Sequence, residues 1–235
     1  MKVYAYCLAA DLDPAAIASV PGVAQTMPVL NNCGVLTAVV SELDNPYVPA
    51  SRENIFAHEH VVSAVMQKVT PLPFRFGMIT LGANLKRYVE TNSQRLLSLL
   101  EHVSGCVQMN VKILVRTDSS RFARPSHDNG VLPEESGPGT RFLARKRVEH
   151  GAAVINSPLA SELAGWISKE FSTMAKDSVV STHSSNSLLA VRFLVPRGQV
   201  EAFSAMLELA RQRRPDLSIM SSGPWAPYHF AQLHS

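Results

Sequence analysis

The chain has 235 residues, of which 46% are hydrophobic and 17% charged, and its formal net charge is +3. This composition is globular, and the weak charge argues against a dedicated nucleic-acid binder, which would need a strong basic stripe. No apolar run is long enough to span a bilayer. The apolar run at 3–10 is short and is followed at once by Asp11 and Asp13, which favours a first β-strand over a cleaved signal peptide.

The first half of the chain predicts an α+β domain. In strand 2–9, strict alternation would place Val3, Ala5 and Cys7 on one face and the residues between them on the other. Ser51 is expected to begin a helix that ends before Pro71. The remaining elements expected in this half are a short helix at 13–21, strands at 23–30 and 34–40 around a turn, a strand at 74–78 and a helix at 82–103.

The second half predicts a ferredoxin-like domain. Residues 107–115 alternate cleanly and indicate a half-buried strand. Residues 117–139 lack any period and predict a flexible insertion. The elements expected after it are helical residues 140–176, strands at 178–184 and 187–195, a helix around 200–210 and a strand at 216–221. The order from residue 107 is β-α-β-β-α-β, which is the ferredoxin-like order.

The predicted fold class is therefore α+β with two domains. Residues 1–104 would form the smaller α+β domain, with helix 82–103 as the connection. Residues 105–235 would form the ferredoxin-like domain, with the insertion 117–139 and an aromatic C-terminal tail. The three cysteines, Cys7, Cys33 and Cys106, are far apart and odd in number, which predicts buried, reduced side chains and a cytoplasmic protein.

The aromatic tail at 223–230 reads Gly-Pro-Trp-Ala-Pro-Tyr-His-Phe. Its prolines stiffen the backbone, so the rings are displayed at little entropic cost. Two interpretations stay open: a plug whose rings cap the core, or a surface that binds a partner. Trp225 is expected to be buried, whereas Tyr228 and His229, each with a polar tip, are the candidates for partner contact.

The sequence predicts no catalytic, cofactor-binding or metal-binding residue, and we expect no enzyme. His58 and His60 are two positions apart on the predicted helix, so they cannot share a metal ion as residues i and i+4 can. Arg75 is expected either to pair with a carboxylate such as Glu59 or to bind an anion. Arg141 and Arg145 lie at i and i+4, on a face that is either solvated or in contact with an acidic partner.

Several stretches, spread in order over nearly the whole chain, resemble one known family. The tail 223–230 is similar to that family's Gly-Pro-Trp-Pro-Pro-Tyr-Ser-Phe ending, with Ala226 and His229 as departures. The other similar stretches are Val3-Tyr4-Ala5-Tyr6-Cys7, His58-Glu59-His60-Val61-Val62, Pro71-Leu72-Pro73-Phe74-Arg75-Phe76-Gly77, residues 107–112 and Gly139-Thr140-Arg141-Phe142-Leu143. By these residues the chain resembles the GvpL/GvpF family of gas vesicle accessory proteins.

The resemblance implies a role in assembling gas vesicles, the hollow, protein-walled organelles that give cells buoyancy. It implies that the partners are the small hydrophobic shell protein and other accessory proteins, and that the protein is cytoplasmic and associated with the vesicle. It implies no nucleic acid, membrane or small-molecule substrate. The alternatives are an enzyme or small-ligand binder on a ferredoxin-like scaffold, and RNA binding on an open sheet face, which would need stacking aromatics.

Overall fold

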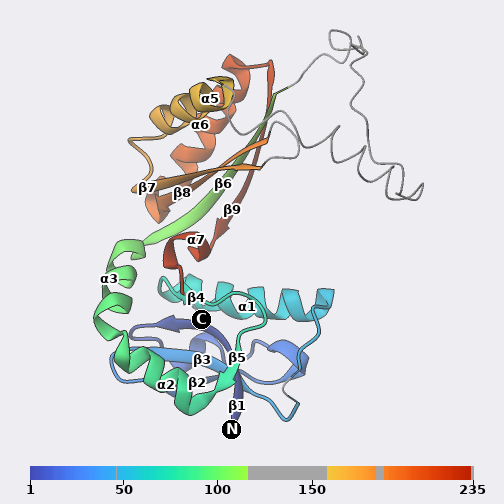
Figure 1. Ribbon diagram of the computed structural model, residues 1–235, viewed down its shortest axis with the longest axis vertical. Helices are drawn as coiled ribbons and strands as arrows, with labels where there is room; N and C mark the ends of the chain where they lie inside the picture. Colours follow the sequence, from blue (N-terminus) through green and yellow to red (C-terminus); the bar gives the residue numbers. More distant parts are fainter. Residues whose placement is uncertain (46, 116–157, 184–187, 234–235) are drawn as a thin grey trace, which may run out of the picture. The chain divides into compact units, whose positions relative to one another are not determined.

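The chain is a mixed α+β structure with two β-sheets (Figure 1). The computed structural model describes residues 1–45, 47–115, 158–183 and 188–233. None of the helices in these ranges is both long and apolar enough to cross a membrane. The predicted insertion at 117–139 lies outside the described residues.

Two compact units make up the described chain. The first comprises Met1–Met109, Leu194–Gly198 and the residues from Gly223 onward, and the second comprises the remainder. The units interleave along the sequence, because the aromatic tail groups with the N-terminal residues. The boundary at 104/105 stays a prediction about which segments fold independently.

The first unit contains a sheet in the order β2-β3-β1-β4, with β5 also paired to β1, and each printed pairing is antiparallel. β1 is the central strand, and its residues Val3–Ala9 are fully buried. The strands of this sheet are β1 (Lys2–Ala9), β2 (Val29–Asn32), β3 (Thr37–Glu42), β4 (Leu72–Pro73) and β5 (Ile79–Leu81).

A β-bulge in β1 corrects the predicted alternation of its faces. The register with β3 shifts between Ala5 and Cys7, so one extra residue is inserted there. As a result Cys7 belongs to the same hydrophobic cluster as Tyr4 and Tyr6, rather than to the opposite face. The predicted alternation fails after the bulge because one inserted residue moves every later side chain to the other face of the sheet.

Helix α1 (Arg52–Lys68) begins where the sequence predicted. The Ser51 hydroxyl caps it by accepting a hydrogen bond from the backbone N–H of Asn54 at 3.3 Å. Val61, Val62 and Val65 are buried in the cluster that contains Tyr4 and Tyr6, so α1 covers that face of the sheet. In Figure 1, α2 lies on the opposite side of the sheet from α1.

The predicted helix at 82–103 is two helices, α2 (Gly82–Thr91) and α3 (Ser93–Val103). Asn92 separates them, with φ of −105° and ψ of 15°. Its side-chain amide donates a hydrogen bond to the carbonyl of Tyr88 at 2.8 Å. Asparagine side chains compete with the helical backbone in this way, which explains the interruption.

The strands predicted at 23–30 and 74–78 differ from the observed ones. Residues 23–30 contain the 3₁₀ turn η2 (Val23–Gln25) before β2, and the short turn η1 (Pro14–Ala16) precedes them. Residues 74–78 form a loop between β4 and β5, because Gly77 adopts a φ of +92° that ends the extended run. We call residues 73–78 the arginine loop.

The second unit is built around three phenylalanines. Phe171, Phe193 and Phe203 are buried, with ring centroids 4.6 to 5.4 Å apart. From residue 106 to the tail the described elements, some of which extend into the first unit, are β6 (Cys106–Val115), α5 (Pro158–Glu170), β7 (Asp177–His183), β8 (Leu188–Pro196), η3 (Arg197–Gln199), α6 (Val200–Arg213) and β9 (Leu217–Trp225). The strands follow the order β7-β8-β6-β9 in the second sheet.

Gly22 allows a turn to approach the buried hydroxyl of Tyr6. That hydroxyl is 2.8 Å from the Ser41 hydroxyl and accepts a hydrogen bond from the Val23 N–H at 2.9 Å. A Cβ atom on Gly22 would lie 2.2 Å from the Tyr6 oxygen and 2.9 Å from the Ser41 oxygen. The position therefore requires glycine for lack of space, although its φ of −89° is open to any residue.

We expect Gly22→Ala to lower the free energy of unfolding by about 1–3 kcal/mol, because overpacking displaces Tyr6 from its hydrogen bonds. The matched control is Gly165→Ala in α5, where no atom lies within 4 Å of the added Cβ. There alanine should be neutral or stabilising by up to about 1 kcal/mol through helix propensity. Urea unfolding of both variants checks this, and equal midpoints would contradict the steric argument.

Candidate functional site

The aromatic tail crosses from a strand into a short helix. β9 runs to Trp225, and α7 (Tyr228–Ala231) follows. Phe230 and Ala226 are buried, but the Trp225 side chain is 38% exposed. The expectation that Trp225 is buried is therefore wrong: it ends a strand, and the two residues before it are also exposed.

Gly223 sets the path of the tail against β6. Its φ is +128°, and a Cβ atom there would lie 2.8 Å from the carbonyl oxygen of Gln108. Both facts exclude other residues at this position. The Gln108 side chain also accepts a hydrogen bond from the backbone N–H of His229 at 2.9 Å, so α7 is held at a fixed place.

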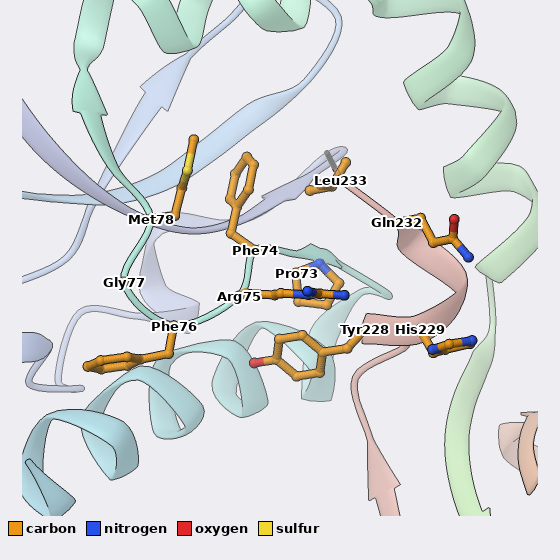
Figure 2. Close-up of a pocket in the computed structure, with 10 residues that line it drawn as sticks. All are labelled: Pro73, Phe74, Arg75, Phe76, Gly77, Met78, Tyr228, His229, Gln232 and Leu233. Carbon is orange, nitrogen blue, oxygen red and sulfur yellow. The ribbon is translucent and has the colours of Figure 1, made fainter. Parts of the chain in front are cut away.

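A pocket of about 490 Å³ lies where the arginine loop meets the tail, within the first unit (Figure 2). Figure 2 shows the Arg75 side chain extending from its loop toward the segment that carries Tyr228 and His229. The ten residues that line the pocket are Pro73, Phe74, Arg75, Phe76, Gly77, Met78, Tyr228, His229, Gln232 and Leu233.

A chain of hydrogen bonds, which we call the buried relay, runs behind this pocket through Tyr4, His58, Tyr228 and Glu59. The Tyr4 hydroxyl is 2.9 Å from His58 Nδ1, and His58 Nε2 is 3.1 Å from the Tyr228 hydroxyl. Tyr228 donates to Glu59 Oε2 at 3.0 Å, and the Gly77 N–H donates to the Tyr4 hydroxyl at 3.1 Å.

The directions of these hydrogen bonds fix the tautomer of His58. Because Tyr228 uses its only proton on Glu59, His58 Nε2 must carry a proton and donate it to Tyr228. Nδ1 is then the acceptor for the Tyr4 hydroxyl. His58 is thus neutral, with both ring nitrogens satisfied, and only 3% exposed.

Burial dominates the electrostatics of the relay. It lowers the pKa of His58 to about 4 from an ordinary 6.5, because the imidazolium would lose its hydration. Burial likewise raises the pKa of the Glu59 carboxyl, with the hydrogen bond from Tyr228 working the other way. The pKa of Tyr228 is raised well above its usual value by burial and then by the neighbouring Glu59. At neutral pH these groups support a fixed structural arrangement.

The structure brings together some of the residues singled out in the sequence. Arg75 and His229 line the same pocket, and the two family-like stretches that carry them, 71–77 and 223–230, meet there. Arg75 does not pair with Glu59, because Arg75 is exposed while Glu59 turns inward to Tyr228. Arg141 and Arg145, the candidate partner contacts, lie outside the described residues.

Tyr228 has an internal role that sequence reasoning missed. Its polar tip suggested a partner contact, yet its hydroxyl joins His58, 170 residues earlier, to Glu59. His60, two residues along α1, points to solvent. The alternation of His58 and His60 on a helix indicated different faces, but no sequence signal indicated which hydroxyls would meet His58. Within the described residues, no three His, Cys, Asp or Glu side chains are grouped so that they could hold a metal ion.

We expect acidification from pH 6.5 to 4 to destabilise the protein through His58. The folded pKa of His58 lies below its unfolded value, so the unfolded chain binds more protons in this window and stability falls as pH falls. Full protonation would cost about 3 kcal/mol. Glu59 acts in the opposite sense, because its raised pKa lets the folded state bind a proton first.

The measurement is the free energy of unfolding against pH for the parent and His58→Gln. The variant should be less stable at pH 7 but lose less stability on acidification. His60→Gln is the matched control, since that side chain is exposed, and it should follow the parent curve. A His58→Gln curve parallel to the parent would rule out His58 as the responsible group.

We also expect Tyr228→Phe to lower the free energy of unfolding by about 1–3 kcal/mol, because buried donor and acceptor groups on His58 and Glu59 lose their partner. Tyr47→Phe, at a position 71% exposed, should have no measurable effect. Thermal melts of the two variants give the comparison. If both melt like the parent, the relay does not hold the tail in place.

Comparisons with known proteins agree with the stretches described above. The family model described as gas vesicle synthesis protein GvpL/GvpF matches residues 2–232. Gas vesicle protein F from a Streptomyces strain is 25% identical over 242 residues, which cover 99% of this chain and 100% of that protein. Gas vesicle protein F1 from Halobacterium salinarum is 24% identical over 203 residues, or 85% of this chain and 78% of that protein.

Solved structures show the same fold. The crystal structure of GvpF from Microcystis aeruginosa has a TM-score of 0.75 at 19% identity, and covers 99% of each chain. The crystal structure of GvpF from an Anabaena strain has a TM-score of 0.73 at 22% identity, and covers 100% of this chain and 97% of that one. Because the match to the family model spans nearly the whole chain, the chain belongs to the GvpL/GvpF family of gas vesicle synthesis proteins.

Proposed function

We propose that this protein is a gas vesicle accessory protein that acts in assembly by binding the hydrophobic shell protein. The family and the names of its relatives support the vesicle role. One observation supports the mode of binding: an uncharged strand with exposed apolar side chains on and beside it lies at the open edge of the first sheet. The protein would act in the cytoplasm, in association with the vesicle.

The open edge is formed by β2. This strand is the first in the order β2-β3-β1-β4, so within the described residues it pairs on one side only. Apolar side chains accompany it: Val29 is 44% exposed, Met27 before the strand 53%, and Val35 in the following turn 53%. An edge strand offers a row of backbone donors and acceptors to another strand.

The edge lacks one common protection against such pairing, which is a charged side chain. Soluble proteins place charges, lysine above all, on exposed edge strands. Here residues 14–41 contain no charged side chain. An uncharged edge flanked by exposed apolar groups supports strand addition by a partner, in which backbone hydrogen bonds give affinity and alternate side chains give specificity.

The shell protein is the partner whose chemistry fits this edge. A small hydrophobic subunit must be kept from aggregating until it joins the vesicle wall. Pairing with this uncharged edge strand would cover the hydrophobic surface of the shell protein and remain reversible. The proposal extends to other accessory proteins, for which Arg141, Arg145, Tyr228 and His229 remain candidate contacts. Tyr228 contributes its ring rather than its hydroxyl, which the relay uses.

The finer fold assignment also belongs to this proposal. From β6 onward the described elements follow the order β-α-β-β-α-β, and the strand order β7-β8-β6-β9 is that expected of a ferredoxin-like domain. The catalytic alternative has less support. In the pocket, Arg75 and His229 are accompanied by no nucleophile, and His58 is buried behind Tyr228.

We expect Val29→Lys to reduce the co-purification of the shell protein at least about fivefold, which corresponds to about 1 kcal/mol. Lysine on an exposed edge strand is tolerated by the fold but must be desolvated if a partner strand covers it. The two proteins are co-expressed, and the soluble shell protein captured with the parent or the variant is quantified at low and high salt.

Leu209→Lys on α6 is the matched control, because Leu209 is 43% exposed and lies far from β2 in the sequence. It should leave capture unchanged, and capture by the parent should persist at high salt because the contact is apolar. If Val29→Lys captures as much shell protein as the parent, the edge is not the binding surface. If the folded parent captures none, the shell-binding proposal itself fails.

A further inference from the structure

The pocket between the arginine loop and the tail is a second surface, which the proposed role of β2 does not use. The side chains that line it include a positive charge and no negative one. Among its ten lining residues Arg75 is the only Lys or Arg, and none is acidic. Arg75 is exposed and, among the described residues, forms neither an ion pair nor a hydrogen bond. A guanidinium without a partner in a pocket without carboxylates is complementary to an anion.

Several backbone N–H groups around the pocket already have acceptors within the protein. The backbone N–H groups of Phe74 and Gly77 donate to the Tyr6 carbonyl and the Tyr4 hydroxyl. In α7, the N–H groups donate to Ala226, Gln108 and Pro227, so the short helix offers no anion site at its N-terminus. A phosphate would need several convergent donors, whereas one planar guanidinium matches one carboxylate.

The wall beside Arg75 is apolar and held in place. Phe76, Met78 and Leu233 are each partly exposed in the pocket. The Phe76 ring packs against Tyr4 and His58, with centroids 5.9 Å away in both cases. Tyr228 is fixed by its hydrogen bonds to His58 and Glu59. The buried relay therefore preorganises the pocket, which lowers the entropic cost of binding.

We propose that this pocket binds an acidic peptide segment of a partner protein, with an Asp or Glu carboxylate on the Arg75 guanidinium. An apolar side chain next to that acid would lie against Phe76, Met78 and Leu233. The volume of about 490 Å³ is within the range of sites that hold drug-sized ligands, which is enough for an acid and its immediate neighbours. The site recognises one charge flanked by apolar groups, and its specificity comes from the bidentate geometry of arginine.

The test is a titration of the full-length, ¹⁵N-labelled protein with two synthetic peptides, acetyl-Leu-Glu-Phe-amide and acetyl-Leu-Gln-Phe-amide, followed by NMR chemical shifts. Both peptides have blocked termini, so the side-chain carboxylate is the only anion. We expect the Glu peptide to shift resonances of 73–78 and 228–233, and to bind at least about tenfold more tightly than the Gln peptide.

Arg75→Gln should abolish this preference, and Arg75→Lys should restore it only in part, because an ammonium lacks the bidentate fork. The matched control is Arg87→Gln on α2, another exposed arginine that forms no ion pair within the described residues. It should leave both affinities unchanged. Because Arg75 is exposed, its substitution is compatible with folding, which the dispersion of the same spectra confirms.

Three outcomes would overturn the proposal: equal binding of the two peptides, an unchanged preference in Arg75→Gln, or shifts confined to other parts of the chain. Inorganic phosphate is titrated in parallel, and tighter binding of phosphate than of the Glu peptide at the same resonances would also overturn it. The result is independent of shell-protein capture through β2, since Val29 is not a pocket residue and no shell protein is present in the titration.

Discussion

The arrangement of the first unit depends on one constraint: the buried side chains of Tyr4 and His58 need hydrogen-bond partners, which they find in each other and in the half-buried Tyr228. A neutral His58 can be buried because Tyr4 and Tyr228 complete its two hydrogen bonds. The same contacts tie β1, α1 and α7 to one another, and Gly77 ties the arginine loop to Tyr4. A buried polar group without a partner would destabilise the fold by more than a typical hydrogen bond stabilises it. The position of the pocket wall thus follows from a desolvation requirement inside the protein.

How far the sequence predicts this structure depends on how local each feature is. The strand at 107–115, the start of α1 at Ser51 and the mixed α+β class follow from periodicity and capping, which act over a few residues. The bulge after Ala5, the break at Asn92 and the loop at 74–78 depend on a register and on hydrogen bonds that only the folded chain supplies. The residue types indicate only a preference for strand, helix or turn, and tertiary contacts override that preference.

The candidate site shows the same division. Arg75, Tyr228 and His229 drew notice because their residue types stand out against their neighbours. Their meeting in one pocket depends on contacts between residues more than 100 positions apart, for which a single sequence holds no signal. Trp225 illustrates the opposite error. Its size predicts burial, but its place at the end of β9 leaves it partly exposed. Residue type alone did not separate the tail residues that face inward from those that face outward.

The grouping of the tail with the N-terminal unit has a consequence for the timing of synthesis. Ala226 and Tyr228 pack into the cluster formed by β1 and α1, yet they leave the ribosome more than 150 residues after α1. Domains generally fold as units during synthesis, but this unit cannot complete its core until the second unit has been translated in between. Until then, Glu59 and His58 lack the hydroxyl that joins them. The core of this unit therefore stays incomplete in the nascent chain until residues 226–231 have been translated and have docked.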